Sequence, residues 1–128
     1  MSAYTVQIAP YGTQCAAYIA AVMVRAYAQE PSVESLRTRF GMSRASAYRW
    51  AAAWRQAHRG GSVPMASPAA VKWLELAFEF RTAPPPLEIF RERFGYCRGQ
   101  AFRVRRTWEL ALRTAAPDRK VRHWEVAA

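Results

Sequence analysis

Cysteine, histidine and acidic residues are scarce in this sequence, and their scarcity argues against disulfide, metal and acid–base chemistry. The 128 residues include two cysteines, Cys15 and Cys97, too few for a disulfide framework or a thiolate metal motif. The two histidines, His58 and His123, stand alone, and we interpret them as surface or helix-end residues rather than metal ligands. The nine acidic residues form no paired-carboxylate or metal-binding cluster. We therefore expect no metal, no cofactor and no enzymatic activity.

Long apolar runs are missing as well. No stretch of about 18 apolar residues predicts a membrane-spanning helix, and the first residues do not have the pattern of a signal peptide. The expected setting is the cytoplasm of a bacterial or phage-infected cell, in association with the nucleoid.

Basic residues, by contrast, are abundant, and almost all of them are arginine. Arginine supplies 17 of the 19 basic residues, and the net charge is +10. Its planar guanidinium group binds phosphates and guanine edges through paired hydrogen bonds, so this composition favours a nucleic-acid partner over a membrane surface. The alternative is that the basic balance serves solubility alone.

An internal repeat organises the chain. The segment from Pro31 to Trp54 aligns without a gap with the segment from Pro85 to Trp108, 54 residues later. The identical pairs are Pro31/Pro85, Glu34/Glu88, Arg37/Arg91, Arg39/Arg93, Phe40/Phe94, Gly41/Gly95, Arg44/Arg98, Ala47/Ala101, Arg49/Arg103 and Trp54/Trp108. We predict an all-α fold of two tandem three-helix units, with residues 1–60 as the first unit, 61–68 as a linker and 69–128 as the second unit.

Periodicity and capping residues predict the helices of the first unit. They are expected from Gln14, capped by Thr13, to about Gln29, from the cap Ser32 to Phe40, and from Arg44 to about Arg59. Gly41 suits the left-handed turn that ends the second helix, and Ser43 suits the cap of the third. The third helix should close a three-helix core against the first helix and the second, using Ala47, Trp50, Ala51, Trp54, Leu36 and Phe40.

The second unit repeats this order. Ser67 should cap a helix from Pro68 or Ala69 to about Thr82, Gly95 should end the next helix, and the last helix should begin at Arg98. The predicted buried positions are Leu87, Phe90, Phe94, Ala101, Val104, Trp108 and Ala111. Cys97 stands where the first unit has Ser43, so the last helix should lose most of its cap and begin less firmly.

The terminal segments show weak period-2 alternation. Tyr4, Val6 and Ile8 alternate near the N-terminus, and Arg122, Trp124 and Val126 do so near the C-terminus. They could pair as a short antiparallel β-ribbon within one chain or across a homodimer, and frayed termini are the equal alternative.

A short helix, a glycine turn and a capped helix together form a helix-turn-helix. The stretch from Phe40 to Trp50, FGMSRASAYRW, resembles the helix-turn-helix of DNA invertases, resolvases and many transposases and phage regulators. The resemblance covers a widespread motif of about 25 residues. It implies that the third helix of each unit enters the major groove of DNA.

The resemblance also implies roles for individual residues. The base-reading positions are Arg44, Ala45, Ser46 and Arg49 in the first unit, and Arg98, Gly99, Gln100 and Arg103 in the second. Tyr48 matches a position that commonly contacts phosphate, and Phe102, its counterpart, has no hydroxyl for that contact. We assign eight further arginines to the DNA backbone, with solvent as the alternative for those on the second helix of each unit: Arg37, Arg39, Arg55, Arg59, Arg91, Arg93, Arg105 and Arg106.

Arg59 has a second interpretation because Gly60 and Gly61 follow it. An arginine beside a glycine linker could enter the minor groove between two sites, and a flexible spacer is the alternative.

The chain has no acidic trio of the transposase kind and lacks room for a recombinase domain. We expect a regulator of transcription, encoded by a phage or mobile element, that binds double-stranded DNA and reads two unlike half-sites arranged head to tail. The alternatives are a phage packaging protein similar to a small terminase subunit, and a protein-interaction module that binds an acidic host partner.

Overall fold

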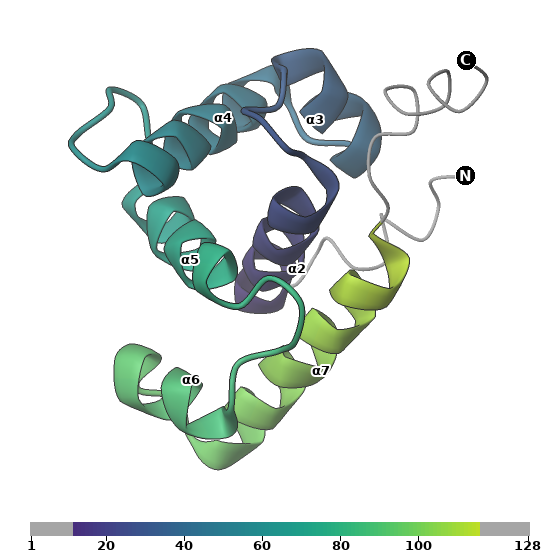
Figure 1. The fold of residues 1–128 in the computed structure, drawn as a ribbon, viewed down its shortest axis with the longest axis vertical. Helices are drawn as coiled ribbons and strands as arrows, with labels where there is room; N and C mark the ends of the chain where they lie inside the picture. The colour runs from purple at the N-terminus through teal and green to yellow at the C-terminus, as the bar shows by residue number, and fades with distance from the viewer. Residues whose placement is uncertain (1–11, 116–128) are drawn as a thin grey trace.

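The computed structural model describes residues 12–115, and in that range it contains helices and no strands (Figure 1). The helices are α2 (Gly12–Ala26), α3 (Val33–Phe40), α4 (Arg44–Arg59), α5 (Pro68–Glu79), α6 (Leu87–Phe94) and α7 (Arg98–Thr114). The predicted all-α class is confirmed for this range. The predicted terminal ribbon, and any homodimer contact made by those segments, lies outside the described residues.

Most helix boundaries follow the predicted capping signals. The Ser32 hydroxyl accepts a hydrogen bond from the Ser35 backbone N–H at 3.0 Å, and the Ser43 hydroxyl accepts one from the Ser46 N–H at 3.1 Å. Gly41 has a φ of 70°, in the left-handed region that residues with a Cβ avoid, and Gly95 has a φ of 71°. The predicted span of α4 is confirmed.

Two helix ends and one cap were predicted wrongly. Helix α2 already begins at Gly12, so Thr13 lies inside it, and it ends at Ala26 rather than near Gln29. Just after this end, the Tyr27 hydroxyl bonds to the Ser35 hydroxyl of α3 at 2.6 Å. Helix α5 ends at Glu79 rather than near Thr82, ahead of the prolines at 84–86, which exclude helical geometry from the residue before each of them.

One hydrophobic core extends through both halves of the repeat. It includes Met23 of α2, Leu36 of α3 and Leu74 of α5, together with Phe90 of α6 and Trp108 of α7. In Figure 1, α2 and α5 lie between α3 and α4 at the top and α6 and the start of α7 at the bottom. The two helix-turn-helix pairs therefore lie at opposite ends of the long axis.

The first helix of each half packs against the third helix of the other half. Helix α2 packs chiefly on α7 and on α5, while α5 packs chiefly on α4 and on α2. Helix α3 packs on α4, and α6 packs on α7, within their own halves. The structure therefore corrects the predicted three-helix core of the first half, because α5 rather than α2 is the main cover of α4.

The side chains explain this exchange. Every residue of α2 from Ala17 to Val24 is buried, and a helix without a polar face needs neighbours on several sides. Helix α4 buries Ala52 and Ala53 in addition to the predicted Ala47, Ala51 and Trp54, whereas Trp50 is only half-buried. The apolar face of α4 is thus wider than one neighbouring helix would cover.

Within residues 12–115, no helix has the length and apolar character needed to cross a membrane.

Candidate nucleic-acid interface

The first two turns of α4 and of α7 are the candidate base-reading surfaces, and both are accessible. Six of the eight predicted base-reading residues are exposed, and the other two, Ser46 and Gln100, are half-buried. The exposed ones are Arg44, Ala45, Arg49, Arg98, Gly99 and Arg103. The two surfaces have the same design because each follows the same glycine turn.

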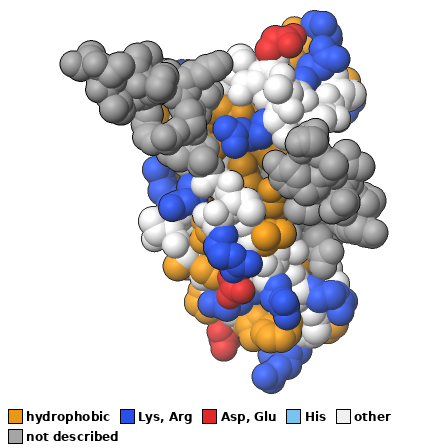
Figure 2. Space-filling view, turned by 90° about the vertical axis from the view of Figure 1, so that its right-hand side faces the viewer, with side chains coloured by type: hydrophobic (Ala, Val, Ile, Leu, Met, Phe, Trp, Pro, Cys, Tyr) orange, Lys and Arg blue, Asp and Glu red, His pale blue; other side chains and the backbone are white. Residues whose placement is uncertain are grey.

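The first two turns of each helix carry positive charge and contain no acidic residue. Helix α4 contains no Asp or Glu, and the first turn of α7 contains none. None of the ion pairs between described residues involves Arg44, Arg49 or Arg98. On the face shown in Figure 2, Lys and Arg side chains recur along the molecule while Asp and Glu are sparse. Such a surface attracts a polyanion.

Arg103 differs from its counterpart Arg49 because Gln100, another of the predicted base-reading residues, holds it. Its Nη2 donates a hydrogen bond to Oε1 of Gln100 at 2.9 Å. Its Nη1 lies 3.8 Å from the position that a Cβ on Gly99 would occupy. The sequence prediction treated these three residues separately, although the spacing of Gln100 and Arg103 places them on one helix face.

The N-terminal caps of the two helices also differ. Cys97 has the same extended backbone as Ser43, with φ −71° and ψ 168° against −68° and 164°, but its side chain makes no capping hydrogen bond. The predicted loss of the cap is therefore confirmed. Although no capping bond is formed, the nearby backbone N–H of Gln100 and, to a smaller extent, that of Gly99 favour the thiolate and so lower the pKa of this exposed thiol. In contrast, burial raises the pKa of the Cys15 thiol.

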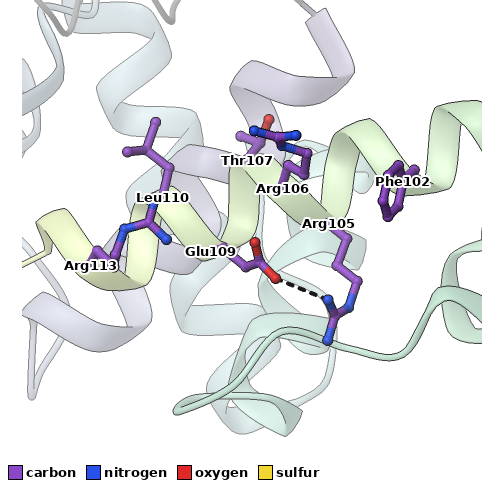
Figure 3. Close-up of a pocket in the computed structure, with 7 residues that line it drawn as sticks. All are labelled: Phe102, Arg105, Arg106, Thr107, Glu109, Leu110 and Arg113. Atoms are coloured by element: carbon purple, nitrogen blue, oxygen red, sulfur yellow. Dashed lines mark hydrogen bonds and ion pairs between the residues drawn. The ribbon is translucent and has the colours of Figure 1, made fainter.

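An aromatic side chain is exposed at the same position of α4 and of α7. Tyr48 is 47% exposed and Phe102 is 54% exposed. Phe102 lies at one end of a shallow pocket of about 590 Å³ on α7, which Arg105, Arg106 and Arg113 also line (Figure 3). The Tyr48 hydroxyl can meet a phosphate, whereas Phe102 offers only an apolar contact.

Four of the arginines assigned to the DNA backbone already have partners in the protein. Arg55 donates two hydrogen bonds to the carboxylate of Glu30, at 2.9 and 2.8 Å. Arg93 binds the carboxylate of Glu79 in the same way, at 2.9 and 3.1 Å. The other two are Arg105, which binds Glu109 and the Pro85 carbonyl, and Arg39, which binds the Tyr27 hydroxyl. A phosphate would have to compete with these partners.

The other four are more available. Arg59, Arg91 and Arg106 are exposed and belong to no ion pair among the described residues. Arg37 approaches Glu34 only to 4.0 Å. These four are therefore better placed than the paired arginines to contact phosphate.

Arg59 lies far from the base-reading turn of its own helix. It is the last residue of α4, about 22 Å along the axis from Arg44 at the usual helical rise. The segment after it folds back on α4, where the Val63 N–H donates to the Gln56 side chain at 3.0 Å. Gly60 and Gly61 make this turn with φ angles of 88° and 84°.

Nothing in the described part of the chain gathers three His, Cys, Asp or Glu side chains as a metal site would. His58 is exposed in the last turn of α4, where its ring stacks on Trp54 with 6.3 Å between centroids. This position agrees with its interpretation as a helix-end residue.

No model of a known protein family matches the chain, and neither a curated protein nor a solved structure matches it significantly. Its function is therefore inferred from its own residues and their geometry.

Proposed function

We propose that the protein binds duplex DNA sequence-specifically through the first two turns of α4 and of α7, and that it regulates transcription. The observation that carries this proposal is the pair of helix-turn-helix elements in which α4 and α7 begin with exposed arginines and have no acidic residue in their first two turns. A helix docked in the major groove presents such residues to the edges of the bases.

The chemistry of the exposed side chains supports base recognition. Arginine pairs with the O6 and N7 atoms of guanine, and glutamine pairs with the N6 and N7 atoms of adenine. Arg49, Arg98 and Arg103 are the candidates for guanine, and Gln100 is the candidate for adenine. Each such pair discriminates against the wrong base by roughly 1–3 kcal/mol.

A second group of side chains supplies affinity without sequence preference. Arg37, Arg59, Arg91 and Arg106 are the arginines best placed for phosphate, and the Tyr48 hydroxyl can add a neutral contact. Each phosphate contact releases a counterion, so binding should weaken steeply as salt is raised.

Selection of binding sequences from a random duplex library, at near-physiological salt, tests the proposal. A two-part motif that the protein protects over about two helical turns would support it. Salt-sensitive binding without any enriched motif would favour the packaging role instead. An absence of binding would favour the module that meets an acidic protein partner.

Substitutions should separate the two groups of arginines. We expect Arg49→Ala or Arg103→Ala to weaken binding to the selected site by about 10- to 100-fold and binding to random duplex far less, because a guanine contact is lost. The matched control is Arg91→Ala, which should weaken both kinds of binding alike. Arg39→Ala is a poorer control because Arg39 also holds Tyr27. Titrations of labelled duplexes give the affinities, and equal specificity losses in all three variants would contradict the assigned roles.

A further inference from the structure

The packing of the first and third helices reveals how the two halves are related in space. Helix α2 of the first half packs on α7 of the second, and α5 of the second half packs on α4 of the first. These two contacts are the same contact with the roles of the halves exchanged, because α2 corresponds to α5 and α4 to α7. Helices α2 and α5 also pack on each other, and this contact stays the same when the two halves are exchanged.

Only one kind of spatial relation produces such reciprocal contacts. If the second half were a translated copy of the first, the contact of α2 with α7 would recur between α5 and a third copy, and α5 would not cover α4. An operation that carries each half onto the other is a two-fold rotation. In Figure 1, a half-turn about the viewing direction exchanges the positions of α3 and α6, and those of α2 and α5.

The two helix-turn-helix elements are also alike internally, so the two-fold relation extends to the recognition surfaces. Helices α3 and α6 begin and end at positions 54 residues apart, and α4 and α7 begin 54 residues apart. The glycines that join them have φ of 70° and 71° with ψ of 20° in both. The first turns of α4 and α7 are therefore presented as two members of a symmetric pair.

We infer that the DNA site of this protein is an imperfect inverted repeat rather than the head-to-tail repeat that the order of the units in the sequence predicted. This inference rests on the proposed function. A two-fold protein places equivalent side chains on opposite strands of the duplex, so its half-sites are inverted. One chain would thus bind as a symmetric dimer does.

The differences between the two first turns make the repeat imperfect. Arg44 and Arg49 have identical counterparts in Arg98 and Arg103, so both half-sites should share the bases that these arginines contact. Ser46 corresponds to Gln100, which also holds Arg103. Because the serine side chain is shorter and lacks the amide, the two half-sites should differ at the base that this position meets.

Three synthetic duplexes derived from the selected sequence test the orientation. One keeps both half-sites as selected, the second reverses one half-site at unchanged centre-to-centre spacing, and the third contains one half-site beside random sequence. We expect the full-length protein to bind the inverted arrangement about 100-fold more tightly than the direct arrangement. The direct arrangement should bind no better than the single half-site.

The outcomes separate this inference from the proposed function. Equal or tighter binding to the direct arrangement would overturn the inverted repeat and leave sequence-specific binding intact. Equal binding to all three duplexes and to random sequence would overturn both.

The double variant Gly99→Ala/Gln100→Ser tests the origin of the imperfection. It gives α7 the residues of α4 at these positions, and an added Cβ at position 99 meets only the Arg103 Nη1 at 3.8 Å, an ordinary contact. Alanine also favours a helix more than glycine does. We expect selection with this variant to yield a perfect inverted repeat of the α4 half-site. An unchanged motif, or one that changes in both halves, would overturn the assignment.

Discussion

Ser43 and Cys97 occupy the same place in the repeat, but only Ser43 caps the helix that follows it with its side chain. The Ser43 hydroxyl satisfies the N–H of Ser46, whereas the Cys97 side chain makes no such bond. We expect Ser43→Ala to lower the free energy of unfolding by roughly 0.5–2 kcal/mol, because it removes a cap. We expect Cys97→Ser to raise the melting temperature, because it restores one.

Thermal and urea unfolding measure both changes. Thr107→Ala serves as a control because the Thr107 hydroxyl bonds within α7, away from the cap. A Cys97→Ser variant less stable than the natural chain would contradict the idea that a cap is missing there.

The ion pair between Glu30 and Arg55 ties the segment before α3 to α4 and should make stability depend on pH. The hydrogen bond from Arg55 lowers the Glu30 pKa below its usual value of 4.5. The pair therefore stabilises the fold above pH 4.5, and this contribution is lost as pH falls through the lowered pKa. We expect Glu30→Gln to cost at most about 1 kcal/mol at pH 7, because both side chains are partly exposed, and nothing at pH 2.

Urea unfolding at both pH values gives the comparison. Glu34→Gln is the matched control, since Glu34 is highly exposed and comes no nearer than 4.0 Å to Arg37, and it should have little effect at either pH. A loss from Glu30→Gln that is as large at pH 2 as at pH 7 would show that the charge is not responsible.

At the scale of the helices, the wide apolar face of α4 is the feature that joins the two halves. Ala53 is fully buried beside Trp54, whose ring meets that of Phe78 in α5 edge-on at 4.9 Å between centroids. We expect Ala53→Leu to destabilise the protein by about 1–3 kcal/mol, because a fully buried position in a closely packed core has no room for the added atoms.

Ala45→Leu is the control, because Ala45 is exposed near the start of the same helix. It should leave the melting temperature almost unchanged. A leucine at position 53 that leaves the melting temperature unchanged would indicate that the core is loosely packed around this position.

The helices also show which parts of the fold the sequence could predict. Ser32, Ser43, Gly41 and Gly95 act on their own neighbours in the chain, so their hydrogen bonds and turns are readable from local pattern. The partner of each helix depends on residues far away. Ala52 and Ala53 are as compatible with solvent as with a core, so the local pattern does not predict that both are buried.

The candidate site divides in a similar way. The exposed first turns at Arg44 and Arg98 follow from the motif, and they were predicted. The ion pairs of Arg55 with Glu30 and of Arg93 with Glu79 were not predicted. Their partners are 25 and 14 residues apart in the sequence and meet only when the helices pack. One signal for the exchanged packing was present in the sequence, namely the unbroken apolar character of 17–24.

For the whole molecule, the exchange of helices predicts that neither half folds as a monomer. The boundaries 1–60, 61–68 and 69–128 remain predictions, and separate fragments 1–62 and 63–128 test them. Without α7 and α5, α2 would expose its apolar surface, so we expect the isolated monomers to lack cooperative unfolding and a mixture to form a folded one-to-one complex.

Circular dichroism and analytical ultracentrifugation of each fragment and of the mixture provide the measurement. A variant mixture in which the 63–128 fragment carries Leu74→Ala should assemble more weakly, since Leu74 is fully buried in α5. Two fragments that unfold cooperatively as monomers would establish autonomous units instead.

The exchanged first helices carry a consequence for the ancestry of the chain. An ancestor of half this length, with the same helix order, could cover its apolar first helix only by swapping it with a sister molecule, so it would have existed as an obligate homodimer. Duplication and fusion of its gene would retain that architecture in one polypeptide. In a homodimer every substitution appears twice, whereas in a single fused chain corresponding positions such as Ser46 and Gln100 can differ while one core contains both halves.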